Sequence, residues 1–175
     1  MPPKRPRPPL DTDALRDLAL RYVGRFATSR ARLLAYLQRK LAERGWAGTN
    51  PADPAALVDR LAALGYVDDA AYAAMKGAAL GRRGYGARRV DDALRGAGIG
   101  AADRAGAGEA ALAQAWAAAD RFARRKRIGP YAATPADRPL REKQIAAFLR
   151  AGHAMATARR WVDAPPGQPP QAEEG

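Results

Sequence analysis

The feature of this sequence that most constrains its fold is a recurrence of glycines that end apolar helical stretches. These glycines lie 53 and 54 residues apart, at Gly45, Gly98 and Gly152. A large apolar residue precedes each of them by four positions, namely Leu41, Leu94 and Phe148. In the preceding helical stretches an aromatic residue recurs at intervals of 50 residues, at Tyr22, Tyr72 and Phe122. A period near 50 residues with three helices in each period indicates tandem helical repeats, none of which closes a core alone.

The rest of the pattern is helical almost throughout. Apolar residues recur at steps of three and four, and the stretches begin at capping residues or prolines, namely Asp11, Ser29, Asp53, Asp68 and Pro139. Residues 100–111 are rich in glycine, which costs about 1 kcal/mol per residue relative to alanine, so we expect only a short, weak helix there. Leu112 is expected to begin a further long apolar stripe. No stretch alternates as a strand would, and the chain is predicted to be all-α.

The period and the composition together predict the domain organisation. We expect three tandem three-helix repeats, stacked into an elongated, curved array, over residues 10–66, 67–108 and 109–163. The flanking residues 1–9 and 164–175 are rich in proline and have no apolar periodicity. Such segments cannot bury enough apolar surface to offset their ordering entropy, so both are predicted to be disordered tails.

Charge is the strongest signal in the composition. Lysine and arginine number 30 against 18 aspartates and glutamates, a formal net charge of +12, which attracts polyanions or an acidic protein surface. The absence of cysteine excludes disulfides, zinc–thiolate sites and thiol catalysis. No apolar run approaches the roughly 18 residues of a membrane span, and the opening MPPKRPRPPL lacks the apolar region of a secretory signal. We therefore expect a cytoplasmic protein with no membrane partner.

Residues that could support catalysis are sparse. The single histidine, His153, directly follows Gly152, and we expect it to pack at a helix end rather than to act as a base or metal ligand. Asp91 and Asp92 are expected in the first turn of a helix, where the helix dipole favours a negative charge. No Walker A motif occurs. We expect no catalysis, no cofactor and no metal.

The stretch LGRRGYGARRVDDAL, residues 80–94, surrounds a Gly-Tyr-Gly with four arginines. It is compatible with a phosphate-cradling loop, a nucleic-acid clamp or an ordinary turn between helices. A phosphate loop needs a preceding strand, which is missing here. We expect a turn that Gly84 and Gly86 permit, with the four arginines on the surface.

Residues 66–99, YVDDAAYAAMKGAALGRRGYGARRVDDALRGAGI, closely resemble the central repeat of the RecX family, bacterial regulators of the RecA recombinase. The matching pieces are GYVDD, AYA, RRGYG and the RRV…L…GI helix. TSRARLLAYLQRKLAERGW resembles the family's first-repeat segment, and residues 112–162 resemble its third repeat. The resemblance covers roughly residues 10–163 and implies three tandem three-helix units. The chain departs from the family at Ala87, where proline is usual, at Arg32, where an acidic residue is common, and in a helix before Gly45 that is about one turn longer.

The resemblance implies a non-enzymatic regulator that binds RecA filaments on DNA. Such a protein lies in the filament groove, inhibits the RecA ATPase and strand exchange, limits filament growth and promotes disassembly, and so acts in DNA repair, homologous recombination and the SOS response. We expect a monomer whose RecA- or DNA-facing residues form two clusters: Arg82, Arg83, Tyr85, Arg88 and Arg89, and Arg121, Arg124, Arg125, Lys126 and Arg127. The arginines offer forked donors to carboxylates or phosphates. Tyr85 either adds apolar contact area or packs beneath the turn.

A stand-alone basic DNA-binding protein of the helix-turn-helix type is the alternative. Such a protein needs a recognition helix with base-contacting polar side chains, and usually a dimer. Asp91 and Asp92 would repel phosphates from the helix after Gly86, which counts against this alternative. Weak, non-specific DNA contact is compatible with both functions. A basic scaffold on ribosomal RNA fits the charge but predicts no repeat.

Overall fold

The computed structural model describes residues 8–172, and this part of the chain is all-helical, as predicted. Its helices are α1 (Thr12–Val23), α2 (Arg30–Arg44), α3 (Pro54–Ala63), α4 (Asp69–Arg82), α5 (Ala87–Arg95), α6 (Ala101–Ala113), α7 (Ala115–Lys126), α8 (Arg138–Arg150) and α9 (Met155–Val162), with one 3₁₀ turn at Gly129–Tyr131. The described residues form no strand, only an isolated bridge between Leu10 and Trp46. Residues 1–7 of the predicted N-terminal tail and 173–175 of the predicted C-terminal tail lie outside the described residues.

The chain divides into two compact units, and the division falls within α4. The first unit runs to Tyr72 and also takes in Ala97–Gly100. The second unit takes Ala73–Gly96 and the chain from Ala101 onward. Each unit has a hydrophobic cluster of its own.

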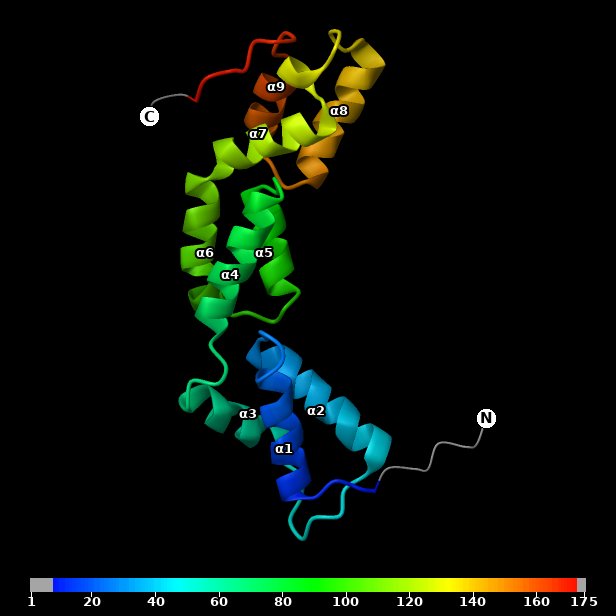
Figure 1. Ribbon diagram of the computed structural model, residues 1–175, viewed down its shortest axis with the longest axis vertical. Coiled ribbons are helices and arrows are strands. Elements are labelled where there is room, and N and C mark those ends of the chain that lie inside the picture. Colours follow the sequence, from blue (N-terminus) through cyan, green and yellow to red (C-terminus); the bar gives the residue numbers. More distant parts are fainter. Residues whose placement is uncertain (1–7, 173–175) are drawn as a thin grey trace, which may run out of the picture. The chain divides into compact units, whose positions relative to one another are not determined.

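In the first unit α1, α2 and α3 pack against one another (Figure 1). Their shared core contains Leu15, Leu33, Leu37 and Leu61, all at most 3% exposed. Leu10 is fully buried beside them, and its backbone N–H donates to the carbonyl of Gly45 over 2.9 Å. The bridge to Trp46 therefore ties the segment before α1 to the end of α2.

In the second unit α7, α8 and α9 enclose an aromatic core (Figure 1). Phe122 and Phe148 meet edge to face with ring centroids 4.7 Å apart, and Trp161 is 2% exposed within the same cluster. In α5, Val90 and Leu94 are buried, and α5 packs on α6. After α9, the Gly167 N–H donates to the Pro130 carbonyl over 2.9 Å.

Side-chain caps begin four of the helices, three of them at predicted residues; Asp137, the cap of α8, was not predicted. Asp11, Ser29, Asp53 and Asp137 each accept a hydrogen bond from the backbone N–H three residues later, which satisfies a donor that the helix itself leaves free. The repeat glycines Gly45, Gly98 and Gly152 all have positive φ, at 78°, 75° and 90°, a conformation that favours glycine. The helix ends predicted at Gly45 and Gly152 are thereby confirmed, whereas α5 ends three residues before Gly98, at Arg95.

Asp68 and Asp69 are adjacent in the sequence but cap two different helices. Asp68 Oδ1 accepts the N–H of Ala71 over 2.8 Å at the start of α4. Asp69 is nearly buried, and its Oδ1 accepts the N–H of Arg30 over 2.9 Å. Asp69 thus caps α2, a helix that begins 39 residues earlier in the chain.

A close contact between a helix start and a glycine recurs, once in each unit. In the first unit Ser29 Oγ donates to the carbonyl of Ala97 over 2.6 Å, and a Cβ on Gly98 would overlap the side chain of Ala31. In the second unit the N–H of Gly86 donates to the carbonyl of Ala151 over 2.9 Å, and a Cβ on Gly152 would overlap the backbone of Arg89. Ala151 and Gly152 follow Ala97 and Gly98 by 54 residues, so the two pairs occupy equivalent positions in the sequence period.

Two predictions about the middle of the chain were wrong. The expected short, weak helix at 100–111 is the 13-residue α6, because alanines surround its glycines and Ala107 packs close to Gly77 of α4. Tertiary contact of this kind overrides a weak propensity. The expected stripe from Leu112 is interrupted at Gln114, the N-cap position of α7, and Leu112 is exposed.

Five large apolar residues that fit the three- and four-residue steps also lie on the surface. The exposed ones are Phe26, Leu64, Met75, Leu140 and Met155. A three- or four-residue step places a residue on a helix face only while the helix lasts, and Phe26 and Leu64 follow the last residues of α1 and α3. The core position of α3 that the pattern missed is Val58, 3% exposed.

Candidate functional site

The Gly-Tyr-Gly segment forms the turn between α4 and α5 and is held in place by two close backbone approaches, at Gly84 and Gly86. Gly84 has φ of 78°, and a Cβ there would lie 2.9 Å from the backbone nitrogen of Phe122 in α7. Gly86 has an ordinary φ of −79°. The prediction that both glycines serve chain reversal is therefore right for Gly84 only. Gly86 is needed because a Cβ would overlap the carbonyl of Gly152.

His153 closes the underside of this turn. Its ring is 2% exposed and lies between Phe122 and Phe148, with centroids 5.5 and 5.2 Å away. Nε2 donates to the carbonyl of Gly84 over 3.0 Å, because a carbonyl can only accept. Burial holds the pKa of the imidazole below its ordinary value of 6.5. The prediction of a packed helix-end histidine is confirmed.

Asp91 and Asp92 do not lie in the first turn of α5, contrary to prediction. α5 begins at Ala87, so both residues lie in its second turn and beyond. Asp91 instead contacts Arg95 over 2.5 Å and Arg104 of α6 over 2.7 Å. The hydrogen bond from Arg104 is the main reason that the pKa of Asp91 lies below its usual value.

A shallow cavity of about 570 Å³ opens beside the turn, and we call it the basic depression. Its floor is apolar, made by Phe122, Ala147 and Ala151. Its rim carries one tyrosine and four cations from three places in the sequence, namely Arg83, Tyr85, Arg125, Lys126 and Arg150. The four cationic residues are exposed.

Tyr85 is the centre of the basic depression. One side of its ring packs against the aromatic core of the second unit. The guanidinium carbons of Arg83 and Arg125 lie 5.4 and 5.9 Å from its ring centroid, within reach of a cation–π interaction. Arg125 also donates to the backbone carbonyl of Arg83. Of the two roles that the sequence left open for Tyr85, packing beneath the turn is therefore observed, and the ring also lies beside two cations. A contribution of its ring to a partner contact stays a prediction.

No acidic side chain lines the basic depression. Within the part of the chain that the structure describes, none of its four cations has a carboxylate within ion-pair distance. Four like charges around one opening repel one another unless an anion lies between them. The arrangement can thus accept a phosphate or carboxylate, and its arginines can donate in pairs to either.

The remaining predicted residues of the second cluster have other contacts. Arg124 lies 4.7 Å from the ring of Tyr131, donates to its hydroxyl over 3.0 Å and contacts Asp120 over 3.7 Å. The Tyr131 hydroxyl in turn donates to Asp120, which raises the pKa of that hydroxyl above 10. Arg127 takes a left-handed backbone, with φ of 54°, at the end of α7.

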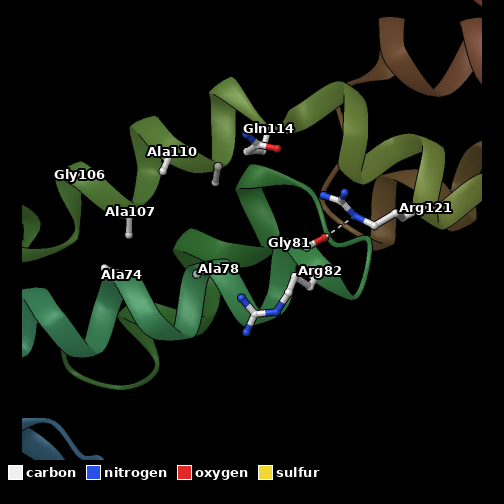
Figure 2. A pocket seen from close by; sticks show the side chains of 11 residues that line it. Ala74, Ala78, Gly81, Arg82, Gly106, Ala107, Ala110, Gln114 and Arg121 are labelled. Carbon is white, nitrogen blue, oxygen red and sulfur yellow. Dashed lines mark hydrogen bonds between the residues drawn. The ribbon is translucent and has the colours of Figure 1, made fainter.

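Arg82 and Arg121 lie at a second feature, a groove of about 320 Å³ between α4 and α6 (Figure 2). Small residues of both helices, including Ala74, Ala78, Ala107 and Ala110, line it. Arg121 Nε donates to the carbonyl of Gly81 over 3.1 Å, as the dashed line in Figure 2 marks. These two arginines are therefore separate from the basic depression.

Arg88 and Arg89 are exposed in the first turn of α5 and do not line the basic depression. Their backbones are fixed against the end of α8, since the N–H of Arg88 donates to the Gly152 carbonyl over 3.3 Å. The first predicted cluster is thus split between the basic depression, the groove and the start of α5.

Arg150 is the member of the basic depression that sequence reasoning missed. It lies in the last turn of α8, where a basic residue is commonly explained by the helix dipole alone. Its position two residues before Gly152, the glycine that packs against Arg89, could have indicated that it lies near the turn.

The residues that the structure describes contain no group of three or more histidine, cysteine, aspartate or glutamate side chains that could hold a metal. Among the described helices none is both long and apolar enough to cross a membrane.

Comparison with known proteins identifies the family. No protein-family model matches the chain. The chain is 33% identical over 178 residues to the regulatory protein RecX of Myxococcus xanthus (strain DK1622), an alignment that covers 94% of this chain and 91% of that protein. Identity at this level over nearly the full length of both proteins agrees with the resemblance in residues 66–99. The chain belongs to the RecX family.

Proposed function

We propose that this protein is a non-enzymatic regulator that binds RecA filaments on DNA, inhibits RecA ATP hydrolysis and strand exchange, and limits filament growth. Its similarity to a protein named regulatory protein RecX supports a regulatory role. Regulation of this kind belongs to DNA repair, homologous recombination and the SOS response. The protein would act in the cytoplasm, as a monomer.

The observation that carries the proposal is the basic depression with no acidic side chain in its lining. A RecA filament on DNA offers acidic protein surface and DNA phosphates, and both are ligands for clustered arginines. We therefore place Arg83, Tyr85, Arg125, Lys126 and Arg150 at the centre of the contact. Arg82, Arg88, Arg89, Arg121, Arg124 and Arg127 would surround it.

The alternative, a helix-turn-helix reader of DNA sequence, is less well supported. Its recognition helix would be α5, whose Asp91 is engaged by Arg95 and Arg104. An ion-paired carboxylate on that helix cannot donate to a base edge and repels phosphates. Weak, non-specific DNA contact remains part of the proposal.

We also propose that the helices of the described residues form three tandem repeats, α1–α3, α4–α6 and α7–α9. The first covers residues 10–66, as expected, but the expected boundary between residues 108 and 109 falls inside α6, so the second repeat extends to Ala113 and the third begins after it. The recurrence of the glycine contact, at Gly98 in the first unit and Gly152 in the second, supports this division. Each of these contacts joins the start of one repeat's second helix to the end of the next repeat's second helix. Such nearest-neighbour contacts are what holds a repeat array together.

The decisive experiment is a titration of the purified protein against RecA on single-stranded DNA, with ATP hydrolysis followed at each ratio. We expect inhibition at substoichiometric amounts. The double variant Arg83→Glu/Arg150→Glu should abolish inhibition, because it reverses two cations of the basic depression whose side chains make no hydrogen bond that holds the fold. Reversal of Arg88 and Arg89 to glutamate should do the same if the contact extends along α5.

The matched control is Arg60→Glu/Arg138→Glu, which changes the net charge equally at two exposed arginines outside both predicted clusters. This control should inhibit RecA as the wild type does, and circular dichroism should be the same for all variants. Absence of inhibition by the wild-type protein at any ratio would contradict the proposed function. Full inhibition by Arg83→Glu/Arg150→Glu would keep the function and remove the basic depression from the contact.

A further inference from the structure

A row of aromatic rings lies at the surface of the first unit, where α1 ends beside α2. The rings of Tyr22 and Tyr36 are stacked with centroids 4.2 Å apart and planes at 24°. Phe26 continues the row, with its centroid 5.3 Å from that of Tyr22. We call these three rings and the cations beside them the aromatic patch.

Packing against the core accounts for Tyr22 and Tyr36 but not for Phe26. Tyr22 and Tyr36 are half-buried and pack against the core of α1, α2 and α3. Phe26 follows the end of α1, and its position is fixed by its own N–H, which donates to the carbonyl of Tyr22 over 2.9 Å. Its side chain is 50% exposed, so about half of a large apolar residue is left to solvent.

Cations lie close to the rings of Phe26 and Tyr36. The guanidinium of Arg25 lies 5.5 Å from the ring centroid of Phe26. Arg39 and Lys40 lie 5.7 and 5.9 Å from the centroid of Tyr36. The only carboxylate in ion-pair contact with these three cations, in the described part of the chain, is that of Glu43, which contacts Arg39 and Lys40 but not Arg25.

We propose that the aromatic patch binds single-stranded nucleic acid, with a base stacked on Phe26 and adjacent phosphates bound by Arg25, Arg39 and Lys40. Aromatic rings interleaved with cations suit this ligand, because each base presents a π-face and each nucleotide brings a negative charge. An apolar side chain of a protein partner would cover Phe26 only by removing the neighbouring Arg25 from water without a counter-charge, since Glu43 pairs with Arg39 and Lys40. A duplex keeps its bases stacked on one another and cannot offer a free face.

This inference does not depend on the contact with RecA. The aromatic patch belongs to the first unit, whereas the basic depression belongs to the second. Substitutions in one therefore leave the residues of the other unchanged.

The test is fluorescence anisotropy of the full-length protein with a dye-labelled oligo(dT) strand and with an abasic strand of equal length, which has the phosphates but no bases. Phe26→Ala should weaken binding to oligo(dT) about 5-fold or more, the loss of one stacked base. It should leave binding to the abasic strand unchanged. Phe26→Trp should retain wild-type affinity, because a larger π-face replaces the phenyl ring.

Tyr66→Ala is the matched control, since Tyr66 is an aromatic residue of the same unit with a similar exposure of 56%. It should bind oligo(dT) as the wild type does. Equal affinity of Phe26→Ala and wild type for oligo(dT), or an abasic strand that binds as tightly as oligo(dT), would overturn the proposal. Loss of RecA inhibition by Phe26→Ala with unchanged oligo(dT) binding would overturn it as well, and would assign the patch to a protein contact.

Discussion

His153 is the residue whose charge is most tightly coupled to the fold. Its burial beside Phe122 and Phe148 removes the imidazole from water and so favours the neutral ring, which donates to Gly84, over the charged one. The turn that carries Tyr85 rests on this histidine. Protonation of His153 is therefore expected to loosen the residues that form the basic depression.

Stability of the protein should fall as the pH drops through 6.5. Because the pKa of His153 is lowered in the folded state, the unfolded chain takes up the proton first, and unfolding becomes easier below the ordinary pKa of 6.5. Above that pH both states are neutral at this position and the full stability is present. Urea unfolding at pH 7.5 and pH 5.5 measures the difference.

His153→Gln provides the control for this pH dependence, because glutamine can donate to Gly84 but does not titrate. Its stability should change less between the two pH values than that of the wild type. Since the chain has one histidine, its NMR ring signals report the folded-state pKa directly. A value of 6.5 or above would contradict the expectation.

Gly152, which packs against the start of α5, is a second position where the backbone requires glycine. Its φ is 90°, and a Cβ would overlap the backbone of Arg89. Gly152→Ala should destabilise the protein by about 2–4 kcal/mol, from backbone strain together with overpacking. Gly65→Ala separates the two causes, because Gly65 has φ of 79° and open space around it; its cost should be only about 1–2 kcal/mol. Equal losses in urea unfolding would show that packing at Gly152 contributes nothing.

Among the elements, α6 is the helix whose sequence is least suited to its structure. Gly106 and Gly108 lie within it, and no atom outside the helix lies within 4 Å of a Cβ at either position. Gly106→Ala and Gly108→Ala should each stabilise the protein by about 0.5–1 kcal/mol, because alanine loses less backbone freedom on folding. Thermal unfolding of the two single variants checks this.

Gly77→Ala supplies a contrast in the facing helix. A Cβ there would meet the side chains of Val90 and Ala107 at 3.3 and 3.4 Å. The gain in helix propensity is then offset by crowding, so Gly77→Ala should not raise the unfolding temperature. A rise equal to that of Gly106→Ala would mean that α4 and α6 do not approach at Gly77.

The sequence was most informative where an element is defined by its own residues. Asp11, Ser29 and Asp53 cap the helices that directly follow them, so local pattern was sufficient to place those helices. It failed where distant residues decide. Asp69 caps α2, Asp91 pairs with Arg104, and α6 packs on α5. None of these partners can be identified from spacing within one helix.

The sequence predicted that the candidate site is basic, but not which of its basic residues lie together. Adjacent arginines in the sequence, such as Arg82 and Arg83, contribute to different features, because Arg82 is the last residue of α4 whereas Arg83 lies in the turn after it. Arg83 joins the basic depression, whereas Arg82 lines the groove of Figure 2. Arg150 joins from another helix. A cluster in sequence therefore indicates a basic region, and only the fold decides which of its cations act together.

For the whole molecule, the question is whether the net charge of +12 or the placement of a few cations governs encounter with a filament. Net charge acts at long range and is screened beyond about 8 Å at physiological ionic strength. Cations held at defined positions act at contact, where screening is weaker.

We expect the association rate with RecA filaments, measured by stopped flow, to fall as salt rises. Arg83→Gln/Arg150→Gln should slow association more than Arg60→Gln/Arg138→Gln, although both remove two charges. The difference should persist at high salt because it arises at contact. Equal rates for the two variants would mean that total charge steers the encounter and that the basic depression adds nothing to it.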